Sequence, residues 1–207
     1  MKNKVNLPNF SIEKNLLEKN YKTIAGIDEV GRGTLAGPVV ACAAILPSAV
    51  PSLKKFLVND SKKLSVKKRM KSFEWLRNWC RSYAIGSSSS EEIDEHGILY
   101  SVKLAMIRAV NNLSIKPDHL IIDAVRLEKL NIDQTCVTKA DEKSESVASA
   151  SILAKVSRDN LMIKLHEKYN EYDFISNKGY GTKNHLLALK KNGPCEIHRK
   201  TFARVND

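Results

Sequence analysis

Four acidic residues stand where their carboxylates could bind a metal ion, and three of them lie beside apolar runs typical of buried strands. Asp28 and Glu29 follow the run "TIAGI", Asp123 ends "HLIID", and Asp141 stands in "TKADEKS" just before a long helical pattern. Acids at strand ends can converge at one edge of a sheet, where close carboxylates repel one another and burial penalises their charge. A divalent cation is the simplest compensation, and oxygen-only ligation suits Mg²⁺ or Mn²⁺. Together the four acids favour a metal cluster.

The neighbouring pair Asp28 and Glu29 sets a condition on this cluster. Adjacent residues of a regular strand point to opposite faces, so both can share one site only if the chain turns there. Gly31 and Gly33 make such a turn credible, and we expect the first strand to end at Asp28. The alternative is that this pair merely begins a turn while the other two acids cap neighbouring elements.

The charge balance indicates what such a cluster could act on. The 207 residues include 34 Lys and Arg against 23 Asp and Glu, a net charge of +11. That excess favours a polyanionic partner, most often nucleic acid. Metal-bound carboxylates in a basic protein suggest phosphodiester hydrolysis, in which two cations about 3.5–4 Å apart generate a hydroxide and stabilise the leaving oxygen.

Several other classes of protein fit the sequence poorly. The four cysteines form no CxxC pair, which argues against a zinc site and a disulfide scaffold. The N-terminal residues lack the apolar run of a secretory signal. The longest apolar run, residues 35–46, is shorter than the roughly 18 residues of a membrane span. We therefore expect a cytoplasmic, monomeric protein without membrane contact.

Two motifs offer competing interpretations. "GRGTLAG" fits the dinucleotide fingerprint at Gly31, Gly33 and Ala36, but Pro38 and a strand-like run follow where that fingerprint needs a helix. The acidic run "EEIDEH" at 91–96 could be taken for a metal site. Its residues suit the first turn of a helix capped by the preceding serines, which already explains them.

The elements that must position the acids follow from periodicity and turn residues. The order of elements predicts an α/β fold in which helices cover the faces of one sheet. The sequence predicts strands at 22–28, 37–46, 82–88, 118–123 and 134–138, and helices at 65–81, 90–112, 144–169 and 182–192. Gly97 is a possible irregularity in the second helix.

Five ordered motifs resemble a known family. "GIDEVGRGTLAGPVVACAAIL" closely resembles the opening signature of bacterial ribonuclease HII, a type 2 ribonuclease H. Agreement continues, in order, in "NDSKKLS", "LIID", "KADEKSESVASASILAKVSRD" and "GYGTKNHLLALKKNGPCEIHRKTF". The resemblance implies the ribonuclease H-like fold, with a mixed central sheet flanked by helices and a C-terminal helical segment. It implies one catalytic domain over 1–207, with its core at about 22–170 and a substrate-binding segment at about 171–207.

The same resemblance implies the activity and the site. It implies endonucleolytic cleavage of RNA in RNA–DNA hybrids, and incision beside single ribonucleotides in duplex DNA. The catalytic, metal-binding acids would be the four already identified. Recognition of the 2′-hydroxyl would fall on Gly31, Arg32, Gly33 and Tyr180. Ribonuclease HIII usually lacks the arginine of this motif. Small departures at Thr34 and Glu142 touch no proposed catalytic position.

Further substrate contacts are weaker predictions. "NDSKKL" reads as a phosphate-contacting loop with Ser61, Lys62 and Lys63, or simply as solvated lysines. Lys143 and Ser144 could meet a phosphate, although Ser144 could equally cap a helix. The residues leave two questions open: whether His198 and Arg199 are structural or touch substrate, and whether the protein is a nuclease or a non-catalytic nucleic-acid-binding protein that keeps the fold.

Overall fold

One mixed five-stranded sheet forms the centre of the protein. The computed structural model describes residues 7–47, 58, 61 and 64–206. The sheet has the order β3-β2-β1-β4-β5, with β1 parallel to β4, β4 parallel to β5, and both other pairings antiparallel. This arrangement confirms the expected mixed sheet. Its strands are β1 (Ile24–Val30), β2 (Val39–Ile45), β3 (Ser82–Ser88), β4 (His119–Asp123) and β5 (Asp133–Val137).

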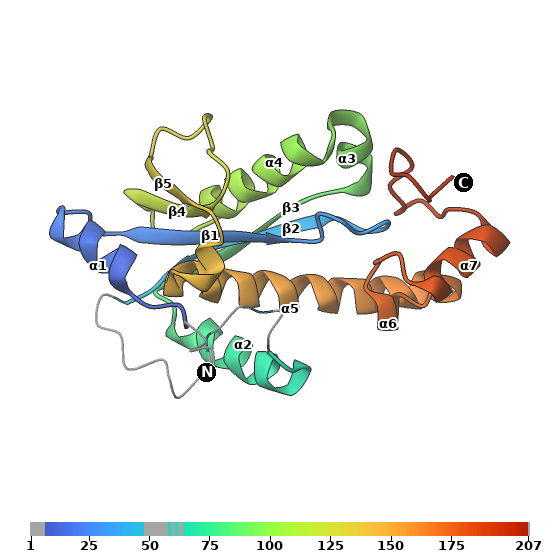
Figure 1. Ribbon diagram of the computed structural model, residues 1–207, viewed down its shortest axis with the longest axis horizontal. Coiled ribbons are helices and arrows are strands. Elements are labelled where there is room, and N and C mark those ends of the chain that lie inside the picture. Colours follow the sequence, from blue (N-terminus) through green and yellow to red (C-terminus); the bar gives the residue numbers. More distant parts are fainter. Residues whose placement is uncertain (1–6, 48–57, 59–60, 62–63, 207) are drawn as a thin grey trace, which may run out of the picture.

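Helices cover both faces of the sheet (Figure 1). Helix α4 (Ile98–Asn111) lies on one face, whereas α5 (Glu145–Lys168), backed by α2 (Val66–Trp79), lies on the other. The remaining helices are short. They are α1 (Ser11–Glu18), α3 (Ser90–His96), α6 (Phe174–Asn177), α7 (Lys183–Asn192) and the 3₁₀ turns η2 (Ala140–Glu142) and η3 (Asn170–Tyr172).

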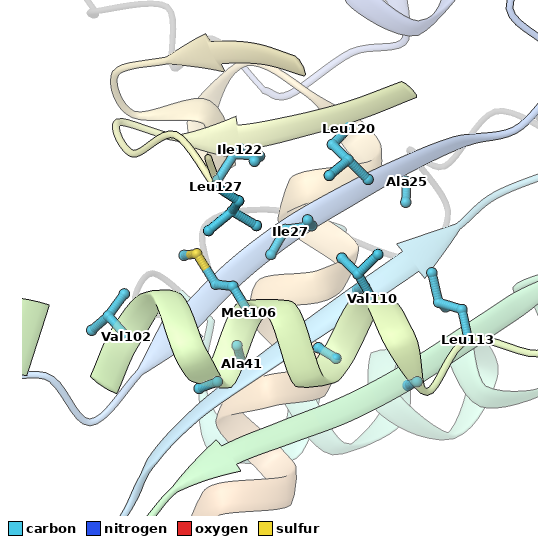
Figure 2. Packing of buried hydrophobic residues seen from close by; sticks show 14 of the residues in the cluster. Ala25, Ile27, Ala41, Val102, Met106, Val110, Leu113, Leu120, Ile122 and Leu127 are labelled. Atoms are coloured by element: carbon cyan, nitrogen blue, oxygen red, sulfur yellow. The ribbon is translucent and has the colours of Figure 1, made fainter. Parts of the chain in front are cut away.

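Alternation along the strands decides which side chain meets which helix layer. Figure 2 shows Ile27, Leu120 and Ile122 directed toward α4, where they pack with Met106. Full burial of each such side chain contributes about 1.5–3 kcal/mol. The intervening residues of β1 face α5. A Cβ atom at Gly26 would overlap the backbone of α5, so glycine lets this helix lie directly on the strand.

The C-terminal segment forms a small second core. Residues of α5, η3, α6 and α7 pack there against the β1–β2 connection. Ala36 of that connection bridges to His198, and both segments lie at the same end of the molecule (Figure 1). The expected C-terminal helical segment is therefore present, and it is tied to the loop that carries the glycine-arginine-glycine motif.

Most predicted elements are present, with instructive differences. The helix predicted at 90–112 is two helices, because Gly97 adopts a φ of +81° between them. The "EEIDEH" run is helix α3, opened by a capping box of Ser89 and Glu92 as the capping interpretation predicted. Strand β2, and not a helix, follows the glycine motif, which excludes the dinucleotide interpretation. Among the described residues, no helix is long and apolar enough to cross a membrane.

Candidate active site and recognition surface

Asp28 and Glu29 lie inside β1, not at its end. Hydrogen-bonded pairing with β2 continues through Asp28, Glu29 and Val30. The prediction that the strand ends and turns at Asp28 is therefore wrong: the ladder keeps the chain extended until Gly31. Since neighbouring residues of a strand face opposite sides, the two carboxylates leave the sheet on different faces.

Three of the four acids lie on the α5 face of the sheet. The register Ile27↔Ile122 makes Asp28 and Asp123 the next pair along the two parallel strands. Asp123 Oδ1 accepts the Ala140 N–H at 3.3 Å, which joins β4 to η2. Asp141 stands in η2, immediately before α5. The structure thus brings Asp28, Asp123 and Asp141 to one face, whereas Glu29, the next residue of β1, leaves the sheet on the other.

Electrostatic repulsion acts on the buried Asp28 carboxyl. Its pKa lies well above the usual value, because of burial first and then of the charges on Glu29 and Asp141. A hydrogen bond with Ser151 of α5 opposes this shift. Asp28 and Asp141 are only 8% and 7% exposed. Ionisation of the Asp28 carboxyl is therefore disfavoured by burial and by the neighbouring acids.

The donor set has the chemistry of a hard-cation site. In the described part of the chain, no three His, Cys, Asp or Glu side chains are arranged as a metal site. The four acids nevertheless offer oxygen donors alone, which suits Mg²⁺ or Mn²⁺. The repulsion at Asp28 is the kind that a divalent cation relieves. The residues therefore fit such an ion in kind.

Two serine hydroxyls link Ser61 of the predicted phosphate loop to Asp28. Ser61 Oγ lies 2.9 Å from Ser151 Oγ, and Ser151 in turn bonds Asp28. Arg69 of α2 holds Ser61 by donating to its carbonyl at 2.8 Å. Ser61 is thus buried beside the acids, whereas Lys62 and Lys63 lie outside the described residues.

The glycine-arginine-glycine loop rests on a fully buried arginine that the sequence analysis missed. Gly31 has a φ of +89°, and a Cβ atom there would overlap the guanidinium of Arg158 in α5. Each of the three side-chain nitrogens of Arg158 donates a hydrogen bond at 2.9–3.0 Å, to the Pro38, Lys178 and Ala36 carbonyls and to Thr34 Oγ1. An arginine inside the helical pattern of 144–169 was the available signal, but its distant partners are invisible in sequence.

Arg199 holds the same loop from the C-terminal side. Its Nη2 donates to the Gly31 carbonyl at 2.6 Å, its Nη1 to the Arg32 carbonyl at 3.0 Å, and its Nε to the Gly37 carbonyl at 3.1 Å. Arg199 and His198 are 0% and 1% exposed. The open question about both residues is thereby answered: they belong to the interior, and Arg199 supports the loop from beneath.

Tyr180 stands on the surface beside this loop. The Leu35 N–H donates to the Gly179 carbonyl at 2.8 Å, so the "GRGTL" and "GYGT" segments form one unit. Tyr180 is 40% exposed, and its ring lies 5.6 Å from Lys155 Nζ and 6.0 Å from the Arg158 guanidinium. Such exposure speaks against a core tyrosine. We call the exposed residues Arg32, Gly33 and Tyr180 the recognition surface.

Lys143 and Ser144 occupy different environments. Lys143 is exposed, and its ammonium donates to the Thr138 carbonyl. Ser144 is buried and caps α5 by accepting the Val147 N–H. Its hydroxyl donates to Glu13 of α1 at 2.6 Å. Ser144 therefore performs the capping role that was one of its two interpretations, and Glu13 is a supporting residue that no sequence motif indicated.

A mixed sheet with this strand order, whose parallel strands β1 and β4 carry neighbouring acids against a helix, is the arrangement of a nuclease with a ribonuclease H-like fold. The crystal structure of ribonuclease H2 from Pyrococcus horikoshii OT3 agrees, with a TM-score of 0.77 and 30% identity over 89% of this chain and 95% of that one. The sequence model described as Ribonuclease HII matches residues 25–205.

Two curated relatives extend this agreement. Ribonuclease HII from Desulfitobacterium hafniense (strain DSM 10664 / DCB-2) is 51% identical over 195 residues, which are 93% of this chain and 73% of the relative. The ribonuclease HII of Endomicrobium trichonymphae is 49% identical over 201 residues, covering 96% and 93%. The chain belongs to the ribonuclease HII family, as the resemblance in sequence predicted, and it is an endoribonuclease of the ribonuclease H type.

Proposed function

We propose that this endoribonuclease requires a divalent cation, cleaves the RNA strand of RNA–DNA hybrids, and incises beside single ribonucleotides in duplex DNA. The observation that carries the proposal is the buried Asp28 carboxyl, held by Ser151 under the charges of Glu29 and Asp141. Burial and repulsion disfavour the charge of this carboxyl, so a function that brings a cation explains its position better than a structural role.

Mg²⁺ or Mn²⁺ would be held by Asp28, Glu29, Asp123 and Asp141. When bound, the cation supplies an activated water and stabilises the charge on the leaving oxygen. The chain's own contribution is orientation. Ser151 directs the Asp28 carboxylate, and the Ala140 N–H directs that of Asp123. The exposed Lys143 lies next to these acids and is available to a phosphate.

The recognition surface would select the ribonucleotide. RNA differs from DNA by its 2′-hydroxyl, which needs donors and acceptors brought within reach of it. Arg32 and Gly33 are exposed, and Tyr180 offers an exposed ring in the neighbouring segment. Helix α5 carries both halves: Ser151 meets Asp28, and Arg158, about 10 Å further along the axis, meets Gly31.

The remaining contacts belong to the same proposal. Lys62 and Lys63, which follow the buried Ser61 in the sequence, would meet the phosphate backbone. The C-terminal segment at about 171–207 would contribute to substrate binding through Tyr180, within a single catalytic domain. The protein's net charge of +11 would attract the polyanionic substrate to these contacts.

A substrate comparison tests the proposal. Cleavage is measured on a continuous hybrid and on a duplex with one embedded ribonucleotide, each with Mg²⁺, with Mn²⁺ and with a chelator. We expect cleavage with either ion and none with the chelator. Tyr180→Ala should reduce cleavage at the single ribonucleotide more than cleavage of the hybrid, because one 2′-hydroxyl offers no second register. The matched control is Tyr100→Ala, a tyrosine of α4 with similar exposure, 42% against 40%.

Three results would count against parts of this proposal. Undiminished cleavage in chelator would remove the metal requirement. Binding of hybrid without cleavage under every condition would favour a non-catalytic nucleic-acid-binding protein. Equal loss of both activities in Tyr180→Ala, together with a lowered melting temperature, would make Tyr180 structural and leave recognition to the glycine-arginine-glycine loop.

A further inference from the structure

Two buried histidines connect residues 195–198 to the main chain of Tyr180. The Cys195 N–H donates to His198 Nδ1 at 2.9 Å. His198 Nε2 lies 3.0 Å from His185 Nε2, and His185 Nδ1 lies 2.9 Å from the Tyr180 carbonyl oxygen. The three contacts form a continuous chain of hydrogen bonds that ends on the exposed tyrosine of the recognition surface.

The direction of this chain follows from its fixed donor. Because the Cys195 amide donates to His198 Nδ1, that nitrogen carries no proton, and the ring proton of neutral His198 is on Nε2. His198 therefore donates to His185 Nε2, which leaves the proton of His185 on Nδ1. His185 in turn donates to the Tyr180 carbonyl. One pair of neutral tautomers satisfies every contact.

The surroundings keep both rings neutral and fixed. His185 and His198 are 0% and 1% exposed, and their rings pack against Tyr172 and Phe174. Burial lowers the pKa of both imidazoles, that of His198 to about 4. Near pH 7 both histidines of this hydrogen-bond chain are therefore neutral. Two neutral imidazoles packed among apolar rings are suited to fixing the group that they bond, here the Tyr180 carbonyl.

We propose that His185 and His198 are positioning residues for ribonucleotide recognition, which fix the carbonyl of Tyr180 and thereby the place of its ring. This inference rests on the proposed role of Tyr180. The same carbonyl also accepts the Thr182 N–H at 2.8 Å, and the Tyr180 N–H donates to the Asn177 carbonyl at 2.9 Å. The histidine bond joins this turn to α7 and, through His198, to residues 195–198.

Two matched substitutions of His185 separate positioning from mere stability. In His185→Asn the amide nitrogen stands in for Nδ1 and keeps the bond to Tyr180. In His185→Gln the amide oxygen stands in for Nε2 and keeps the bond to His198, but the bond to Tyr180 is lost. We expect the Gln variant to lower the ratio of single-ribonucleotide to hybrid cleavage by about 3- to 10-fold, the effect of one buried hydrogen bond. The Asn variant should keep the ratio within about twofold of the unmodified protein.

Amide hydrogen exchange of Tyr180 and Thr182 provides a readout independent of substrate. Exchange should be faster in His185→Gln than in His185→Asn. If the Gln variant does not fold, the next link gives the same test: His198→Asn loses the donor to His185, whereas His198→Gln keeps it. Equal ratios in the matched variants would overturn the inference, as would faster exchange with an unchanged ratio.

The Tyr180→Ala variant, measured in parallel, distinguishes the recognition role of Tyr180 from the positioning role of the two histidines. If Tyr180→Ala lowers the substrate ratio and the matched histidine variants do not, the positioning role fails while the recognition role of Tyr180 stands. If Tyr180→Ala itself leaves the ratio unchanged, the recognition role fails, and the positioning role fails with it.

Discussion

The acid site and the recognition surface use buried charge in opposite ways. At the acid site, Asp28 is buried under the charges of Glu29 and Asp141, and its pKa is raised well above the usual value. Beneath the recognition surface, Arg158 and Arg199 are also buried, but their side-chain nitrogens donate to loop carbonyls and to Thr34. We expect a cation to stabilise the first region, whereas the second is organised by hydrogen bonds from within the protein.

The largest effect should come from the acid site. Asp28→Asn should reduce cleavage by at least about 10²–10³-fold, the cost of removing one preorganised charge-stabilising group. Asp123→Asn should act similarly. The melting temperature of the metal-free Asp28→Asn protein should rise, because the buried, repelled carboxylate is gone. Cleavage at saturating Mg²⁺ and a melting curve in chelator measure both effects.

The contrast with an ordinary carboxylate is the control for this prediction. Glu167→Gln removes an exposed acid from the same helix, α5, and should change neither cleavage nor melting. Unchanged turnover of Asp28→Asn would exclude Asp28 as a ligand. A fall in its metal-free melting temperature would show that neighbouring groups stabilise the Asp28 carboxylate in the absence of metal. Both regions would then hold their buried charges by favourable contacts.

The next effect should come from the support of the recognition surface. Gly31→Ala forces a positive φ on alanine and places its Cβ in the Arg158 guanidinium. The backbone strain costs about 1–2 kcal/mol, and displaced carbonyl bonds cost about 1–3 kcal/mol. Urea unfolding should therefore show a loss of about 2–5 kcal/mol. Gly33→Ala is the matched control, since a Cβ there meets nothing within 4 Å.

These two regions also differ in how far sequence could predict them. The acids and the glycine motif are local patterns, so strand position and family resemblance found them. The turn expected at Asp28 was wrong because pairing with β2 depends on a partner strand that local residues do not reveal. Arg158 and Arg199 escaped functional assignment because most of their partners lie 120 or more positions away in the chain. Helix α1 was missed for a similar reason, since Glu13 bonds residues 144 and 146.

The pH dependence of stability should have opposite signs in the two regions. The pKa of His198 falls from 6.5 to about 4 on folding, so the unfolded chain binds the proton first on acidification. The contribution of this residue is complete above pH 6.5 and is lost as the pH falls toward 4. We expect a loss of about 1–3 kcal/mol over that interval. His198→Gln should flatten it in urea titrations; an unchanged slope would contradict a neutral buried ring.

Glu145, beside the acid site, should show the reverse trend. Burial, and then Glu13, raises its pKa from 4.5 to about 7. The folded protein therefore holds this proton more tightly, and the stabilisation is present below pH 4.5 and lost as the pH rises through 7. Glu145→Gln should accordingly stabilise the metal-free protein at pH 8 by about 1–3 kcal/mol and change little at pH 4. Destabilisation at pH 8 would mean that the ionised carboxylate is favourably paired.

The smallest expected effect separates the two regions by charge. Phosphate contacts release counterions, so each one adds about 0.9 to the slope of log K against log salt. Lys62→Ala should reduce that slope by about one contact, which changes affinity about threefold between 50 and 200 mM salt. Tyr180→Ala removes a neutral ring, so it should shift the whole line without changing its slope.

The matched control is Lys116→Ala, which should leave both slope and intercept unchanged. Lys116 is exposed and lies just before β4, at the end of that strand remote from Asp123. A slope that changes equally in Lys62→Ala and Lys116→Ala would mean that the basic surface attracts the polyanion diffusely, and the phosphate contact assigned to Lys62 would have to be withdrawn.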